Sequence, residues 1–157
     1  MKTKLDSADK VFEVASVVFL LTNILTVAIS LPGLPDVVPN HFDINGQPNQ
    51  YGSKHFLWIS VAVSMLIYML LGVIARFPES FNYPSQKNDK QSQYKLGVKL
   101  LRSLKACILL FLTILTFEMI RSAQTGSAKN AIWLIGIVPA FLAANLIWFA
   151  VKWKKLK

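Results

Sequence analysis

Reactive side chains are scarce in this sequence of 157 residues. It contains one cysteine, Cys107, two histidines, and eight Asp and Glu residues against 17 Lys and Arg residues. A lone cysteine cannot form an internal disulfide. The sequence also lacks a glycine-rich phosphate loop, a Gly-x-Ser-x-Gly motif, a His-Glu-x-x-His zinc motif and a Cys-x-x-Cys pair. We therefore expect a protein that is not an enzyme and that holds neither a metal nor a cofactor.

Apolar residues are abundant, at 54 % of the chain against 16 % charged residues. They concentrate in four stretches, at residues 11–31, 56–75, 103–120 and 131–151. A helix of about 20 mostly apolar residues crosses a hydrocarbon core that is ~30 Å thick. The pattern predicts an all-α fold, an integral membrane four-helix bundle that forms a single membrane domain over residues 1–157.

The third helix is expected to be longer than its apolar part. Asp89 is a suitable N-cap, and Tyr94, Val98 and Leu101 follow it at three- and four-residue spacing. We therefore predict one helix from about residue 89 to residue 122, of which residues 103–120 lie in the membrane.

The basic residues are distributed very unevenly among the connecting segments. Fourteen of the 17 Lys and Arg residues precede the first apolar stretch, follow the last, or lie between the second and third or at the start of the third. Basic segments stay on the cytoplasmic side of a membrane. We expect a multi-pass protein of the inner membrane with both termini in the cytoplasm. The net charge of +9 then sets topology and contacts anionic headgroups, so the lipid bilayer rather than nucleic acid is the expected partner.

The segment between the first two helices, residues 32–55, is too long to be a simple connector. Loops of this length are usually functional or disordered. Asn45-Gly46 is a strong tight-turn signal and favours a short hairpin, whereas Pro39 and Pro48 argue against a regular ladder. We predict an ordered outer loop that covers the ends of helices 11–31 and 56–75.

This loop holds the candidate ligand- or partner-binding residues. They are Asp36, Asn40, His41, Phe42, Asp43, Gly46, Tyr51, Gly52, Ser53 and Lys54. His41 and Asp43 alternate along an extended segment, so they could contribute to a metal site, although a site needs more ligands than these. In the alternative interpretation, Asp36, Asn40 and Asn45 cap turns, while His41 and Lys54 hydrogen-bond the loop closed.

Polar residues within the apolar stretches have local explanations. Glu13 has Lys10 three residues before it, and Glu118 has Arg121 three residues after it, so we expect an ion pair at each position. Ser60, Ser64 and Tyr68 share one face of their helix at four-residue spacing. Hydrogen-bonding residues of this kind commonly join helices in lipid, so we expect them in helix packing.

The outer loop resembles the first-loop signature of SdpI-type proteins, bacterial immunity proteins against a secreted toxic peptide. The shared elements are Leu34-Pro35, Pro39 followed by His41-Phe42, Gly46, and Gly52-Ser53-Lys54. The resemblance covers about residues 11–75 and implies a membrane domain of unknown function. Phe81-Asn82-Tyr83-Pro84 and Gln93-Tyr94 are similar to a cytoplasmic loop of short bacterial relatives. SdpI-type proteins themselves carry further membrane helices and a C-terminal domain.

These observations favour a bacterial membrane protein that binds a peptide, a lipid or a protein partner through its outer loop, in toxin immunity or envelope sensing. A peptide toxin and a membrane protein are the candidate partners. A structural subunit or assembly factor of a membrane complex is the alternative. A small transporter or a membrane enzyme is a third hypothesis.

Overall fold

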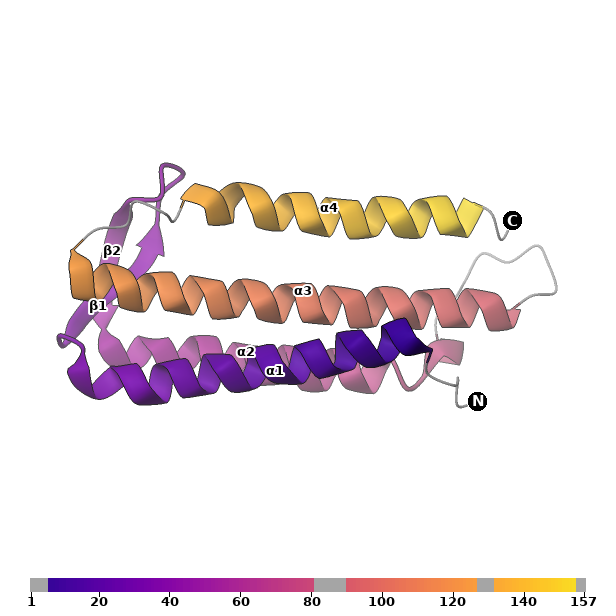
Figure 1. Ribbon diagram of the computed structural model, residues 1–157, viewed down its shortest axis with the longest axis horizontal. Coiled ribbons are helices and arrows are strands. Elements are labelled where there is room, and N and C mark those ends of the chain that lie inside the picture. The colour runs from indigo at the N-terminus through magenta and orange to yellow at the C-terminus, as the bar shows by residue number, and fades with distance from the viewer. Residues whose placement is uncertain (1–5, 81–89, 127–131, 155–157) are drawn as a thin grey trace.

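The computed structural model describes residues 6–80, 90–126 and 132–154, and these residues are mostly helical (Figure 1). The long helices are α1 Ser7–Ser30, α2 Leu57–Ile74, α3 Lys90–Thr125 and α4 Ile132–Lys154. Three short 3-10 turns are η1 Leu31–Gly33, η2 Lys54–Phe56 and η3 Pro78–Ser80. The expected N-cap Asp89 and the segment 81–84 lie outside the described residues.

Among the described residues, three helical segments are long and apolar enough to cross a membrane, namely Ser7–Gly33, Lys54–Ile74 and Lys90–Thr125. Their outer surfaces carry many exposed aliphatic and aromatic side chains, as lipid-facing surfaces do. The membrane environment that the apolar stretches predict is therefore supported by the helices that these stretches form.

Helix α1 begins four residues before the predicted start because of its N-terminal cap. The Asp6 carboxylate accepts a hydrogen bond from the Asp9 backbone N–H at 2.8 Å, and the Asp9 carboxylate accepts one from the Asp6 N–H at 3.1 Å. This reciprocal capping box satisfies two N–H groups that a helix start leaves free. The pair Asp6 and Asp9, three residues apart, is a capping signal in the sequence that the apolar pattern alone did not use.

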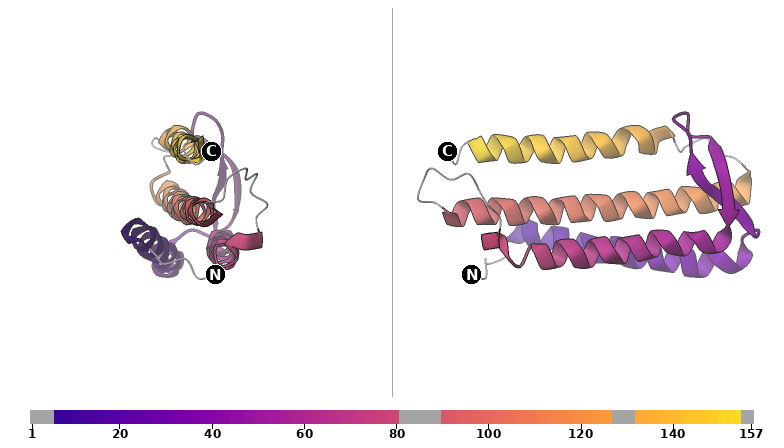
Figure 2. Two further views of the ribbon diagram at one scale, coloured as in Figure 1. Left: turned by 90° about the vertical axis from the view of Figure 1, so that its right-hand side faces the viewer. Right: turned by 180° about the vertical axis from the view of Figure 1, so that it is seen from behind.

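The helices pack unequally (Figure 2). Helices α1, α2 and α3 pack against one another, whereas α4 packs chiefly along α3. The arrangement is thus a bundle of three helices with α4 beside it. Helix α1 begins and α4 ends at the same end of the molecule, opposite the strands.

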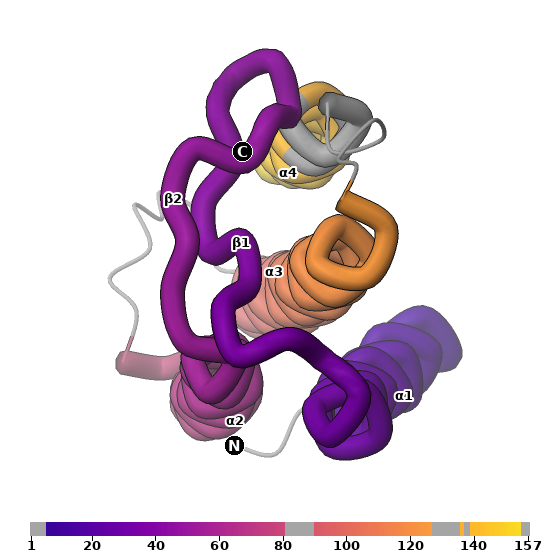
Figure 3. Tube along the Cα trace, turned by 90° about the vertical axis from the view of Figure 1, so that its left-hand side faces the viewer, coloured from indigo at the N-terminus to yellow at the C-terminus, as the bar shows by residue number. Residues whose placement is uncertain are grey.

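The described residues are mostly helical, and the segment between α1 and α2 forms the short hairpin that the Asn45-Gly46 signal favours. Strands β1 Val37–Phe42 and β2 Pro48–Ser53 pair antiparallel, with register irregularities between Pro39 and Phe42. A proline lacks the N–H that a regular ladder needs, which accounts for an irregular register beside Pro39. The hairpin lies across one end of the bundle and reaches from α2 over α3 toward α4 (Figure 3).

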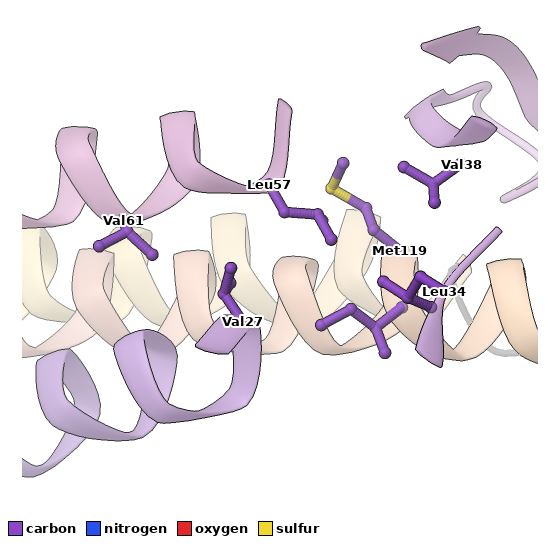
Figure 4. Packing of buried hydrophobic residues seen from close by; sticks show 7 residues of the cluster. Val27, Leu34, Val38, Leu57, Val61 and Met119 are labelled. Carbon is purple, nitrogen blue, oxygen red and sulfur yellow. The ribbon is translucent and has the colours of Figure 1, made fainter. Parts of the chain in front are cut away.

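The apolar core lies under this hairpin (Figure 4). It is formed by buried side chains from α1, β1, α2, α3 and the segment that follows η1: Val27, Leu34, Val38, Leu57, Val61, Met119 and Ile120. Leu34 and Val38 join the hairpin to the helices, because they belong to the outer segment yet pack among helix residues. The core therefore sets the position of the hairpin.

Polar contacts join the helices farther along the bundle. The Asn23 side-chain amide donates to the Ser64 hydroxyl at 2.9 Å, and the Ser60 and Thr116 hydroxyl oxygens lie 2.7 Å apart. These bonds link α1 to α2 and α2 to α3. The predicted packing role of Ser60 and Ser64 is confirmed.

Candidate functional site

The hairpin is tied to the bundle at its base by Lys54. The Lys54 Nζ donates to the Leu34 carbonyl oxygen at 3.2 Å and lies 3.1 Å from the Asp36 carboxylate. The Lys54 backbone N–H also donates to the Asp36 carbonyl oxygen at 2.9 Å. The prediction that Lys54 closes the loop is confirmed, and Asp36 acts as its ion-pair partner rather than as a turn cap.

Asp43 organises the hairpin turn. Its carboxylate accepts hydrogen bonds from the backbone N–H groups of Asn45, at 2.9 Å, and Gln47, at 2.8 Å. Gly46 has φ of 75°, in the left-handed region that glycine adopts without steric cost. The turn signal at Asn45-Gly46 is confirmed, although Asp43 rather than Asn45 provides the cap.

Cross-strand contacts occupy several other predicted site residues. The His41 Nδ1 hydrogen-bonds the Asn49 side-chain oxygen. The side chain of Asn40 lies over Gly52, where a Cβ atom would stand 2.8 Å from Asn40 Nδ2. The hydroxyl of Ser53 accepts from the His55 N–H at the start of η2. The contacts of His41 and Asn40 hold the two strands together, whereas the Ser53 hydroxyl caps η2.

His41 and Asp43 have different partners, one across the hairpin and the other in the turn. Within the described ranges, 6–80, 90–126 and 132–154, no three His, Cys, Asp or Glu side chains are grouped closely enough to hold a metal ion. His41 and Asp43 are thus accounted for by hairpin architecture.

The outer surface of the hairpin exposes apolar side chains. Tyr51, a predicted site residue, is 61 % exposed, and two residues that the sequence reasoning missed, Val37 and Ile44, are 60 % and 81 % exposed. Phe42 differs from them, because it packs against the apolar core. The missed signal was the presence of aliphatic residues in an otherwise polar loop outside the helices.

A second polar site, the charged cluster, lies at the opposite end of the bundle. It comprises Asp9 and Glu13 of α1 and Arg102 and Lys105 of α3. Glu13 Oε1 lies 3.1 Å from Arg102 Nε, Glu13 Oε2 lies 2.7 Å from Lys105 Nζ, and Asp9 Oδ1 lies 3.3 Å from an Arg102 terminal nitrogen. Asp9 Oδ1 makes no hydrogen bond, so its contact with Arg102 is an ion pair only.

The predicted pair of Glu13 with Lys10 is therefore wrong, because Glu13 reaches across to α3. The predicted pair of Glu118 with Arg121 is confirmed at 2.8 Å. The sequence offered no signal for the pairing between helices, since residues almost a hundred positions apart meet only after α1 and α3 pack. Lys99 extends the contact by pairing with Asp6.

Lys99 also lowers the pKa of Asp6, the N-cap residue of α1. Its ammonium group, together with the Asp9 N–H, holds the pKa of Asp6 below its ordinary value. The charged form of Asp6 is favoured because both neighbours donate hydrogen bonds to it.

The family comparison covers the hairpin but not the charged cluster. Residues 17–67 match the family model described as a domain of unknown function, DUF1648. A DUF1648 domain is present in this chain. The match includes the hairpin with all ten predicted site residues, and it leaves out Asp9, Glu13, Arg102 and Lys105. No curated protein and no solved structure matches the chain.

Proposed function

We propose that this protein is a non-enzymatic, multi-pass protein of the bacterial inner membrane that binds a peptide or protein partner through the outer surface of its hairpin. All four long helices lie in the membrane, both termini are cytoplasmic, and the hairpin is extracytoplasmic. The Lys and Arg bias supports this orientation. The likeness of the loop to SdpI-type proteins supports a role in toxin immunity or envelope sensing.

The observation that carries the proposal is the contrast between the two sides of the hairpin. Val38 and Leu34 are buried in the core, whereas Val37, Ile44 and Tyr51 are each at least 60 % exposed. These three residues lie between two candidate membrane spans, Ser7–Gly33 and Lys54–Ile74, and in neither of them. Apolar groups that face water in a well-anchored segment are typical of binding surfaces.

The strand arrangement favours an extended peptide over a lipid as the occupant. In a two-stranded sheet each strand is paired along one edge only. Strand β1 contacts α3, so β2 presents the edge away from the bundle (Figure 3). An extended peptide can add to such an edge through backbone hydrogen bonds, and Tyr51 on β2 would supply side-chain contact.

Site-specific crosslinking in native membranes tests this function. A photoreactive phenylalanine analogue replaces Tyr51, and a matched control places it at Leu66, which is similarly exposed on the membrane-spanning helix α2. We expect a discrete protein or peptide adduct from position 51 that is missing at position 66. A fully inserted protein with no adduct at position 51, or with the same adducts at both positions, would contradict the proposal.

The alternative, a structural subunit of a membrane complex, is favoured by one observation. Helix α4 packs chiefly on α3 and leaves Phe141, Leu146 and Ile147 more than half exposed. The same photoreactive group at Ile147 distinguishes the two functions. A stoichiometric adduct there, with none at position 51, would favour the subunit.

A further inference from the structure

We propose that the cavity between α1, α2 and α3, at the end of the bundle opposite the hairpin, binds the phosphate-bearing headgroup of an anionic lipid. This site is independent of the hairpin. Three members of the charged cluster line it, namely Glu13, Arg102 and Lys105.

The cavity has a volume of about 420 Å³ and a mixed lining. Three cationic side chains line it, Arg76 after α2 and Arg102 and Lys105 of α3. Apolar side chains of α2, including Met69 and Val73, complete the wall. A cavity lined by both cationic and apolar groups suits the two parts of a lipid molecule.

Lys105 is the most deeply placed of these cations, with only 2 % of its side chain exposed. A buried ammonium group needs compensating partners. Glu13 provides one at 2.7 Å, and the Tyr68 ring lies 4.6 Å from Nζ in a cation–π contact. Because an ammonium group has three N–H donors, this arrangement leaves Lys105 able to donate to a further acceptor.

Gly72 leaves space on α2 beside the Lys105 ammonium group. A Cβ atom at position 72 would lie 4.0 Å from Lys105 Nζ, so any longer side chain would fill the space beside the ammonium group. Helix α2 thus has its smallest residue where a ligand would approach Lys105.

The lining cations outnumber the lining carboxylates. Glu13 is shared between Arg102 and Lys105, and Asp9 contacts Arg102 from outside the cavity. Arg76 is exposed and forms no ion pair with any residue in the described part of the chain. A net positive cavity favours an anion, and guanidinium and ammonium groups both donate well to phosphate oxygens.

The surroundings favour a lipid as the source of that phosphate. Met69 and Val73 line the cavity and are also more than half exposed on α2, which is a candidate membrane span. An acyl chain can follow these side chains while its headgroup reaches Arg76 and Lys105. Basic pockets between helices at a cytoplasmic membrane surface bind anionic headgroups in this way.

Thermal unfolding of the full chain in neutral detergent tests the site. Phosphatidylglycerol is added in increasing amounts, with phosphatidylcholine and inorganic phosphate as the comparison ligands. We expect phosphatidylglycerol alone to raise the unfolding midpoint in a saturable manner.

Three variants separate this site from general charge attraction. Arg76→Gln removes the exposed lining cation and should weaken phosphatidylglycerol binding about tenfold, as expected for the loss of one charged hydrogen bond. Lys95→Gln removes one positive charge from an exposed position near the same end of α3 and should leave binding unchanged. Gly72→Leu fills the cavity without changing the charge and should abolish the shift.

Several results would overturn the proposal. Phosphatidylcholine could give the same shift, or inorganic phosphate could reproduce it, which would identify a free anion as the ligand. Equal losses in Arg76→Gln and Lys95→Gln would show nonspecific attraction. If Gly72→Leu folds and phosphatidylglycerol still raises its unfolding midpoint in a saturable manner, the lipid binds elsewhere. If Gly72→Leu does not fold, the comparison of Arg76→Gln with Lys95→Gln tests the site instead.

Discussion

At the scale of single residues, the buried Lys105 ammonium group depends on Glu13 for its counter-charge. The Lys105 side chain is almost fully buried, and Glu13 is the carboxylate closest to it. The Asp36 and Lys54 pair forms a useful contrast, because the Asp36 side chain is 94 % exposed. The nitrogen–oxygen distances of the two pairs are similar. Their contributions to stability should therefore differ because of burial rather than distance.

Replacing the two carboxylates by amides measures this difference. Glu13→Gln should lower the free energy of unfolding by about 2 kcal/mol, because it leaves a buried ammonium group without its counter-charge. This value is below the roughly 3–5 kcal/mol of a fully buried pair, since Glu13 itself is 31 % exposed. Asp36→Asn should cost less than about 1 kcal/mol. Equal losses in denaturant unfolding of the two variants would contradict this assignment.

At the scale of elements, the start of α1 is held to α3 by a contact that responds to pH. Lys99 keeps the pKa of Asp6 below its ordinary value, so the folded state binds fewer protons there than the unfolded state. The contact therefore stabilises the fold above the ordinary Asp pKa, and this contribution is lost as pH falls through the lowered pKa.

Replacing Lys99 should remove most of the lowering of the Asp6 pKa. In Lys99→Gln the pKa of Asp6 should rise toward its ordinary value, whereas Lys95→Gln, on the same helix, should leave it unchanged. Carboxyl chemical shifts followed by NMR across acidic pH measure this directly. A pKa of Asp6 that is the same in both variants would show that the helix cap, rather than Lys99, lowers it.

The elements also show what a sequence can and cannot predict here. The sequence placed α2 and α4 within a few residues of their observed bounds, because an apolar stretch of bilayer length needs no knowledge of its neighbours. Asn45-Gly46 placed the turn, because its conformational preference is local. Glu13 was assigned to Lys10 since spacing reveals only contacts within a helix. Its true partners, Arg102 and Lys105, depend on the packing of α1 against α3.

At the scale of the whole molecule, the ion pairs that join α1 to α3 lie at one end. The apolar core and the hairpin occupy one end, the neutral pairs Asn23–Ser64 and Ser60–Thr116 lie in the bundle, and the charged cluster occupies the opposite end. This placement agrees with the proposed orientation, in which the end that carries the charged cluster lies at the cytoplasmic surface. The proposed partner binding by the hairpin depends on that orientation.

Cysteine labelling in intact cells tests the orientation most directly. Single cysteines replace Gln47, in the hairpin turn, and Lys90, at the start of α3, in a Cys107→Ala background; both positions are exposed. A thiol reagent that cannot cross the membrane should label position 47 in intact cells and position 90 only after the cells are permeabilised. Labelling of position 90 but not of position 47 in intact cells would place the hairpin in the cytoplasm and contradict the proposed function.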